Sequence, residues 1–153
     1  MTMKPCICLS DKTIDAQVLA KNFDQDSACG AVASFAGHVR ANADLTALEL
    51  IHHPVLTSHA LEQIGESAMA QFSLQKLLIA HRHGRMAVGE TIVYIAAASA
   101  HRRAALDAVS YTIDVLKTQA PFWKREWRGN DAVWIEPTAD DHTASDQWME
   151  TTS

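Results

Sequence analysis

TIDVLKTQAPFWKRE, residues 112–126, joins the end of an amphipathic helix to an extended segment flanked by aromatic residues. Pro121 ends the helix, because proline lacks the amide that would continue it and drives the preceding residue toward an extended conformation. The chain can fold back here and bring Lys117, in the last turns of the helix, close to Lys124. Two lysines that meet beside aromatic side chains predict a half-enclosed pocket for an anion.

A lysine in such a pocket can carry chemistry, because burial and a neighbouring cation disfavour its ammonium form. The same pattern also has a purely structural explanation, since lysines near the C-terminus of a helix stabilise the helix dipole. This stretch alone leaves both explanations open, and the rest of the chain has to decide between them.

The charge distribution favours a small anionic ligand. The chain has 153 residues and a formal net charge of −5, with 48% hydrophobic and 20% charged residues. Residues 76–128 hold nine Lys or Arg against four Asp or Glu, whereas residues 129–153 hold six acidic residues and no Lys or Arg. A nucleic-acid binder is more often basic overall, so a local basic patch indicates a small anion and no nucleic acid. The longest apolar run, Ile92–Ala98, is too short to span a membrane.

Cysteine and histidine usage favours a reduced protein without a bound metal. Cys6, Cys8 and Cys29 form no even disulfide framework, and no long apolar segment precedes a cleavage site near the N-terminus, so a cytoplasmic location is expected. The eight histidines include no HExxH motif and no finger-like spacing with cysteine. His81 and His83 share a strand face, but a cation lies between them. We therefore expect no metal and no cofactor.

The apolar pattern predicts a single α+β domain with a mixed or antiparallel sheet and packed helices. Alternating or continuous apolar runs predict strands, and apolar residues at helical spacing predict helices. The expected strands are Lys4–Leu9, Gly30–Val39, Thr46–His52, Lys76–His81, Glu90–Ala98, Phe122–Trp127 and Ala132–Glu136. The expected helices are Ile14–Phe23, Ser58–Phe72 and His101–Gln119, the last of which Ser99 would cap.

The C-terminal end differs from the rest of the chain in composition. The folded domain is expected to span residues 1–137. Residues 138–153 are acidic, rich in Thr and Asp, and without helical or strand periodicity. They predict a mobile tail, unless Trp148 docks it on the domain.

Two further segments could bind an anion. In FAGHVR, residues 35–40, the glycine permits close approach of a ligand, and Arg40 at a strand end offers a guanidinium fork for phosphate. A solvated arginine at the end of a strand is the alternative. In SAHRR, residues 99–103, His101 and Arg102 open a helix, where free amides attract anions. Cations oppose the helix dipole there, which favours a role with an external anion.

Together these segments resemble the large, catalytic subunit of molybdopterin synthase. The shared motifs follow the family's order at similar spacing, from about residue 4 to Glu136. They are Phe35-x-Gly37-x-Val39-Arg40, His81-Arg82-x-Gly84, Gly89-Glu90, Ser99-Ala-His101-Arg102 and Leu116-Lys117-x-x-Ala120-Pro121-x-Trp123-Lys124-x-Glu126. The last motif and the Ser-Ala-His-Arg helix start are specific in combination. The resemblance implies the α/β-hammerhead fold of that subunit.

The resemblance also implies a sulfurtransferase of molybdenum cofactor biosynthesis. That enzyme forms the dithiolene of molybdopterin from cyclic pyranopterin monophosphate. Sulfur arrives as the C-terminal thiocarboxylate of a small ubiquitin-like partner, whose Gly-Gly tail enters the pocket, and the large subunits form a homodimer within a heterotetramer. Lys117 and Lys124 would be the catalytic lysines. The implied substrate-binding residues are His38, Val39, Arg40, His101, Arg102, Lys117, Lys124, Arg125 and Glu126.

The chain departs from the family pattern at two places. Residues 51–56, IHHPVL, stand where Glu-x-Tyr-x-x-Met is frequent, and Arg85 follows Gly84 where glutamate is frequent. Both departures bear on partner contacts and local packing more than on the chemistry. Two other functions are to be weighed against the sulfurtransferase: a non-catalytic module that binds an anion or a partner, and a different enzyme with a phosphate substrate.

The spacing of two implied site residues predicts a site shared between protomers. His101 and Lys117 lie near opposite ends of one expected helix, which places them about 24 Å apart. Residues 104–116 contain no Pro or Gly that would break this helix. A twofold dimer would bring the His101 and Arg102 end of one helix to the Lys117 end of its mate.

Overall fold

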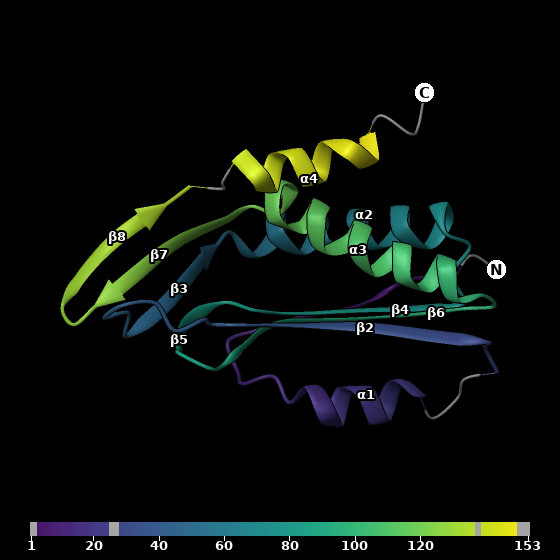
Figure 1. Cartoon of the computed structure of the whole chain (residues 1–153), viewed down its shortest axis with the longest axis horizontal. Coiled ribbons are helices and arrows are strands. Elements are labelled where there is room, and N and C mark those ends of the chain that lie inside the picture. The colour runs from purple at the N-terminus through teal and green to yellow at the C-terminus, as the bar shows by residue number, and fades with distance from the viewer. Residues whose placement is uncertain (1–2, 25–27, 137–138, 150–153) are drawn as a thin grey trace.

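The computed structural model describes residues 3–24, 28–136 and 139–149, which form helices packed on two sheets (Figure 1). The strands are β1 (Cys6–Ser10), β2 (Ala31–His38), β3 (Ala47–His52), β4 (Lys76–Arg82), β5 (Gly84–Ala87), β6 (Thr91–Ser99), β7 (Phe122–Arg128) and β8 (Asp131–Ile135). The helices are α1 (Ala16–Asp24), α2 (Pro54–Gln71), α3 (Arg102–Gln119) and α4 (Ala139–Met149). The predicted α+β class is confirmed. No helix of the described residues has the length and apolar character needed to cross a membrane.

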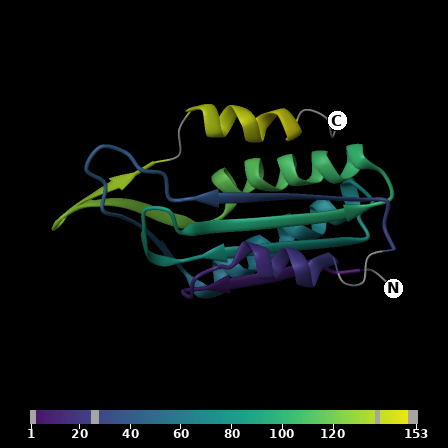
Figure 2. The ribbon, with the colours of Figure 1, turned by 60° about the horizontal axis from the view of Figure 1, so that its bottom comes forward.

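The main sheet has the strand order β1-β4-β6-β2 and is mixed, since β1 runs parallel to β4 and the other neighbours are antiparallel. Helices α2 and α3 cover one face and α1 covers the other (Figures 1 and 2). The central strands β4 and β6 are thus buried on both faces, which explains their nearly continuous apolar sequences. Ile79 and Ile95 belong to the core under α2 and α3, whereas Leu78 and Tyr94 pack with Phe23 of α1.

The second sheet is antiparallel, has the order β5-β3-β7-β8, and extends beyond one end of the main sheet (Figure 1). Leu48, Leu50 and Met86 form its small core. The four-residue strand β5 is absent from the expected strands, because Gly84 and Gly89 indicate turns and leave only a short segment between them. Both glycines do adopt positive φ, 85° and 92°, where side chains are disfavoured.

The junction at Pro121 folds back as the sequence predicts. Helix α3 ends at Gln119, Ala120 is extended with φ −76° and ψ 128°, and β7 begins at Phe122. Strand β7 then pairs antiparallel with β3, with Lys124 opposite Leu50. One proline therefore connects the helix that carries the first lysine to the strand that carries the second.

The three predicted helix starts all differ from the structure, and α1 begins at Ala16, two residues after the expected Ile14. Ser99 is not the cap of α3: it is the buried last residue of β6, and His101 occupies the cap position without a capping side-chain bond. Helix α2 begins four residues earlier than expected, because Pro54 fits its first turn and His53 Nδ1 accepts a hydrogen bond from the Leu56 amide at 3.4 Å.

Residues 139–149, expected to form a mobile tail unless Trp148 docks, form α4 alongside α3 (Figure 1). The sequence leaves open that Trp148 docks the tail on the domain, and in the structure it does. Its ring lies edge-on to Phe72 and Tyr111, with centroids 6.0 and 5.7 Å away. Its Nε1–H also donates to Asp114 Oδ2 at 2.8 Å. Residues 137–138 and 150–153 lie outside the described part of the chain.

Candidate functional site

A cavity of about 600 Å³ opens where the end of β2, the last turn of α3 and β7 meet. Six of the nine predicted site residues line it: His38, Val39, Arg40, Lys117, Lys124 and Glu126. Apolar side chains such as Leu48, Ile92 and Leu116 form much of the remaining wall. The fold therefore gathers residues from three distant segments around one space.

Lys117 and Lys124 meet in this cavity, as the fold-back at Pro121 predicts. The pKa of Lys124 is lowered, first by burial and then by the positive charge of Lys117, while Asp141 and Glu126 act in the opposite direction. A lysine whose ammonium form is disfavoured releases and regains a proton more readily near neutral pH. The pair thus combines an anion-attracting charge with a group suited to proton transfer.

The backbone beyond β2 holds Arg40 at the cavity. Val39 is buried and fixed by two backbone hydrogen bonds: its amide donates to the Glu90 carbonyl at 2.9 Å, and its carbonyl accepts from the Gly89 amide at 2.8 Å. His38 and Arg40, on either side of it, stay exposed. This anchored segment places a guanidinium at the cavity edge, where it can bind phosphate oxygens in pairs.

His81 and Phe122 form a stacked pair in the wall of the cavity, with ring centroids 4.3 Å apart and an interplanar angle of 16°. His81 is only 8% exposed, and its Nδ1 lies 2.8 Å from the Arg82 carbonyl. Burial lowers its pKa from 6.5 to about 4, with a smaller contribution from Lys124, so the imidazole is neutral at pH 7. The sequence indicates His81 as a possible metal ligand and as part of the His81-Arg82-x-Gly84 motif, but gives it no role in the site. A histidine near the end of a buried apolar strand was the unused signal.

Acidic side chains also reach the cavity. Glu126 lines it from β7, Glu136 from the segment after β8, and Asp141 from α4. Glu126 is itself held by Arg128, whose Nη2 donates to its Oε2 at 3.1 Å. The sequence missed Glu136 and Asp141 because they belong to, or border, the part expected to lack regular structure. Asp141 and Glu126 favour the charged form of Lys124, and the three carboxylates limit the cavity's net positive charge.

Arg125 of β7 was predicted to be a site residue, but its side chain does not line the cavity. Neighbouring residues of a strand point to opposite faces, so Arg125 faces away from Lys124. Its Nε donates to Glu49 at 2.8 Å, and this hydrogen bond is the main reason that the pKa of Glu49 is lowered. Its guanidinium also packs over Trp127, as does that of Arg85 at 4.3 Å. The Arg85 departure from the family pattern therefore belongs to the packing of this sheet.

His101 and Arg102 also lie outside the cavity within one chain. Both are exposed at the N-terminal end of α3, and Lys117 lies in its last turn. The helix is continuous over Arg102–Gln119, so no break brings its two ends together. The rise of an α-helix separates His101 from Lys117 by about 24 Å.

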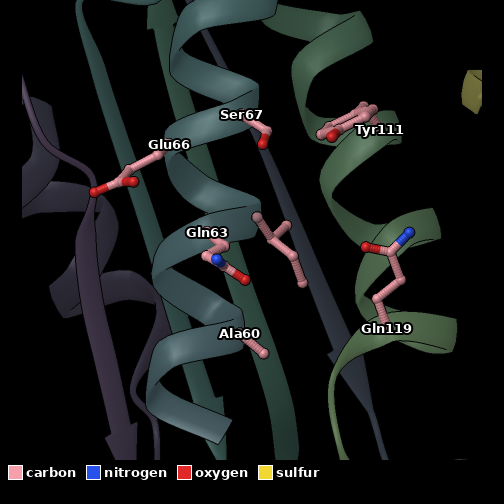
Figure 3. Close-up of a pocket in the computed structure, with 7 residues that line it drawn as sticks. Ala60, Gln63, Glu66, Ser67, Tyr111 and Gln119 are labelled. Atoms are coloured by element: carbon pink, nitrogen blue, oxygen red, sulfur yellow. The ribbon is translucent and has the colours of Figure 1, made fainter. Parts of the chain in front are cut away.

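A second, smaller cavity of about 400 Å³ lies between α2 and α3 (Figure 3). Ser67 and Tyr111 face each other across it, and their hydrogen bond partly opposes the burial that raises the pKa of Tyr111. Its described lining includes Glu66 but no Lys or Arg. An anionic ligand therefore fits the first cavity and not this one.

The fold and the first cavity define an α+β protein with a lysine pair, an arginine and an apolar wall around one cavity. The model of the MoaE protein family matches residues 9–119. The molybdopterin synthase catalytic subunit of Caulobacter vibrioides is 42% identical over 144 residues, covering 93% of this chain and 96% of that protein. The subunit of the same name from Pseudomonas aeruginosa is 41% identical over 129 residues, with coverages of 82% and 86%.

A solved structure agrees with these sequence relatives. The molybdopterin biosynthesis MoaE protein from Burkholderia ambifaria MC40-6 superposes with a TM-score of 0.81 at 31% identity, covering 95% of this chain and 98% of that one. The chain therefore belongs to the MoaE protein family, and the resemblance drawn from its motifs is confirmed.

Proposed function

We propose that this chain is the catalytic subunit of a molybdopterin synthase. It transfers sulfur from the C-terminal thiocarboxylate of a small ubiquitin-like carrier to cyclic pyranopterin monophosphate and so forms the dithiolene of molybdopterin. Relatives with this name cover nearly the whole chain at about two-fifths identity. Because these relatives are named as subunits, we expect this chain to work with a partner protein. In this proposal the partner is the carrier that supplies the sulfur.

The observation that carries the proposal is the meeting of Lys117 and Lys124 in one cavity. An anion-binding module needs positive charge but gains nothing from a lysine whose pKa is lowered, as that of Lys124 is. Sulfur transfer needs both properties, because the reactants are anionic and oxygen must leave as sulfur adds. The lysine pair attracts the thiocarboxylate and moves the protons.

Arg40 binds the cyclic phosphate in this proposal. It lies at the same cavity as the lysines, and a guanidinium gives phosphate oxygens two parallel hydrogen bonds. The apolar wall around Leu48 and Ile92 accommodates the flat pterin. Each transfer forms one carbon–sulfur bond on the pterin side chain and breaks the acyl carbon–sulfur bond of the carrier. The acyl carbon takes up an oxygen from water or from the displaced substrate oxygen, so the carrier leaves as a carboxylate.

The reaction takes place in the cytoplasm in this proposal. Cys6 and Cys8 are exposed, free and close in sequence, as suits a reducing compartment. A thiocarboxylate carrier also requires a setting in which reduced sulfur persists.

The complete site is shared between two copies of the chain. His101 and Arg102 are exposed cations at the end of α3 that is remote from their own Lys117. A twofold dimer, with one carrier bound to each chain, places this end at the neighbour's cavity and adds two anion-binding groups to it.

Complementation tests the shared site. Lys117→Ala chains are mixed with Arg102→Ala chains under conditions that exchange subunits. A mixed dimer holds one site with both defects and one site with neither, so activity returns. Verified exchange without any recovered activity would refute the sharing.

Reconstitution tests the function itself. The chain is incubated with a thiocarboxylated carrier and cyclic pyranopterin monophosphate, and molybdopterin is measured after oxidation to a fluorescent derivative. Product that depends on all three components supports the proposal. Tight binding of both reactants without product would show a binding module instead.

A further inference from the structure

His81 lines the reaction cavity, yet the lysines and Arg40 account for the anions without it. It comes from β4, the central strand of the main sheet, whereas the charged residues come from the edges of the cavity. Its ring is fixed on both sides: Phe122 stacks on its face, and the Arg82 carbonyl holds its Nδ1 at 2.8 Å. His81 is one of six buried polar or charged residues in the described part of the chain.

The contact with Arg82 decides which ring nitrogen can meet a ligand. A carbonyl only accepts hydrogen bonds, so Nδ1 must carry a proton. The neutral ring then has its free lone pair on Nε2. His81 lines the cavity, and its Nδ1 is taken by the Arg82 carbonyl, so Nε2 is the ring nitrogen left for a ligand there.

We propose that His81 is a substrate-positioning residue whose Nε2 accepts a hydrogen bond from an N–H group of the pterin ring. The phosphate end of the substrate is held by Arg40, and a second fixed contact at the ring end sets the direction of the side-chain carbons toward Lys117 and Lys124. An acceptor without charge suits this task, because it adds no negative charge to a cavity that Glu126, Glu136 and Asp141 already line. This inference rests on the proposed function.

The neutral state of His81 is maintained by its surroundings. Lys124 of β7, His52 of β3 and His83 after β4 all oppose a positive charge on the ring, and burial opposes it most strongly. Protonation would turn Nε2 from an acceptor into a donor and remove the proposed contact. The pKa of about 4 keeps this change away from neutral pH.

Two substitutions of His81 distinguish the role of its hydrogen-bond acceptor from the role of its stacked ring. His81→Gln loses the ring but can place an uncharged carbonyl oxygen near the Nε2 position. His81→Phe keeps the ring on Phe122 but has no acceptor. Exposed His59 on α2 gives the matched control, His59→Gln.

Equilibrium binding of cyclic pyranopterin monophosphate without carrier is the direct test, with inorganic phosphate as a second probe. His81→Phe is expected to weaken pterin binding about tenfold, the order of one lost hydrogen bond to a fixed partner. His81→Gln should stay within about threefold of wild type. Neither variant should change the affinity for phosphate, and His59→Gln should change nothing.

The opposite ranking overturns the proposal. If His81→Phe binds the pterin as well as wild type while His81→Gln is weaker, His81 serves only as a stacking group. Equal loss of phosphate binding would indicate a damaged cavity. Failure of the proposed function gives a different result, because wild type would then neither bind the pterin nor form molybdopterin.

Discussion

Replacing His81 with phenylalanine should remove much of the acid sensitivity of the folded chain. The unfolded chain binds a proton at this histidine near pH 6.5, but the folded chain does so only near pH 4. Between these values the unfolded state holds more protons, so the free energy of unfolding rises with pH. A shift from 6.5 to about 4 amounts to about 3 kcal/mol in full, of which about 2 kcal/mol separates pH 5 from pH 7.5.

Urea unfolding at pH 5 and pH 7.5 measures this difference. Wild type should lose about 2 kcal/mol more than His81→Phe on acidification. The pKa of His52 is also lowered, chiefly by burial, but both proteins retain it and the comparison cancels its effect. His59→Gln should keep the wild-type profile, because His59 is exposed. Identical pH dependence in wild type and His81→Phe would refute the neutral, buried imidazole.

Three further substitutions test the roles assigned to individual contacts. Arg40→Lys should weaken binding of the phosphate-bearing substrate about tenfold in a titration, because a single ammonium replaces a paired contact. Arg125→Lys should leave that affinity unchanged but lower the free energy of unfolding by about 1–2 kcal/mol, since its bond to Glu49 is internal to the second sheet; an effect on substrate affinity would contradict its placement. Trp148→Phe should retain ring packing, lose the bond to Asp114, and make α4 more sensitive to protease; unchanged cleavage would contradict the docking.

The central part of the site could be predicted because local chemistry decides it. Proline at position 121 ends the helix, and the chain can then fold back and bring the lysines before and after it close together. The motif order likewise predicted the cavity position of Arg40. These features depend on neighbours in the sequence, so the three-dimensional context has little opportunity to change them.

Contacts between distant elements decided the rest. Residues 139–149 have no apolar periodicity, and side-chain contacts position α4. Trp148 reaches Asp114 and the rings of Phe72 and Tyr111, and Ser145 accepts a hydrogen bond from Thr118. The direction of the Arg125 side chain could have been predicted from the sequence, because successive residues of a strand point to opposite faces and Lys124 points into the cavity. The motif comparison alone placed Arg125 in the site.

The role of His81 shows a different limit. The apolar sequence of β4 predicts a buried strand. One histidine in such a strand does not change the apolar pattern, so the pattern says nothing about its role. Only the structure places it beside Phe122 and Lys124 and gives Nδ1 a carbonyl partner. Tautomer and charge both follow from that environment.

Single-turnover sulfur transfer tests the central claim most directly. Wild type, Lys117→Ala and Lys124→Ala are each saturated with the thiocarboxylated carrier and the cyclic pterin, and the rate of molybdopterin formation is measured. Lys21→Ala, an exposed lysine on α1, is the control and should match wild type. Both cavity variants should remain folded and lose at least about a hundredfold in rate, the typical contribution of a positioned proton-transfer group. Wild-type rates in a well-folded Lys117→Ala or Lys124→Ala protein would contradict the lysine pair as the reaction centre.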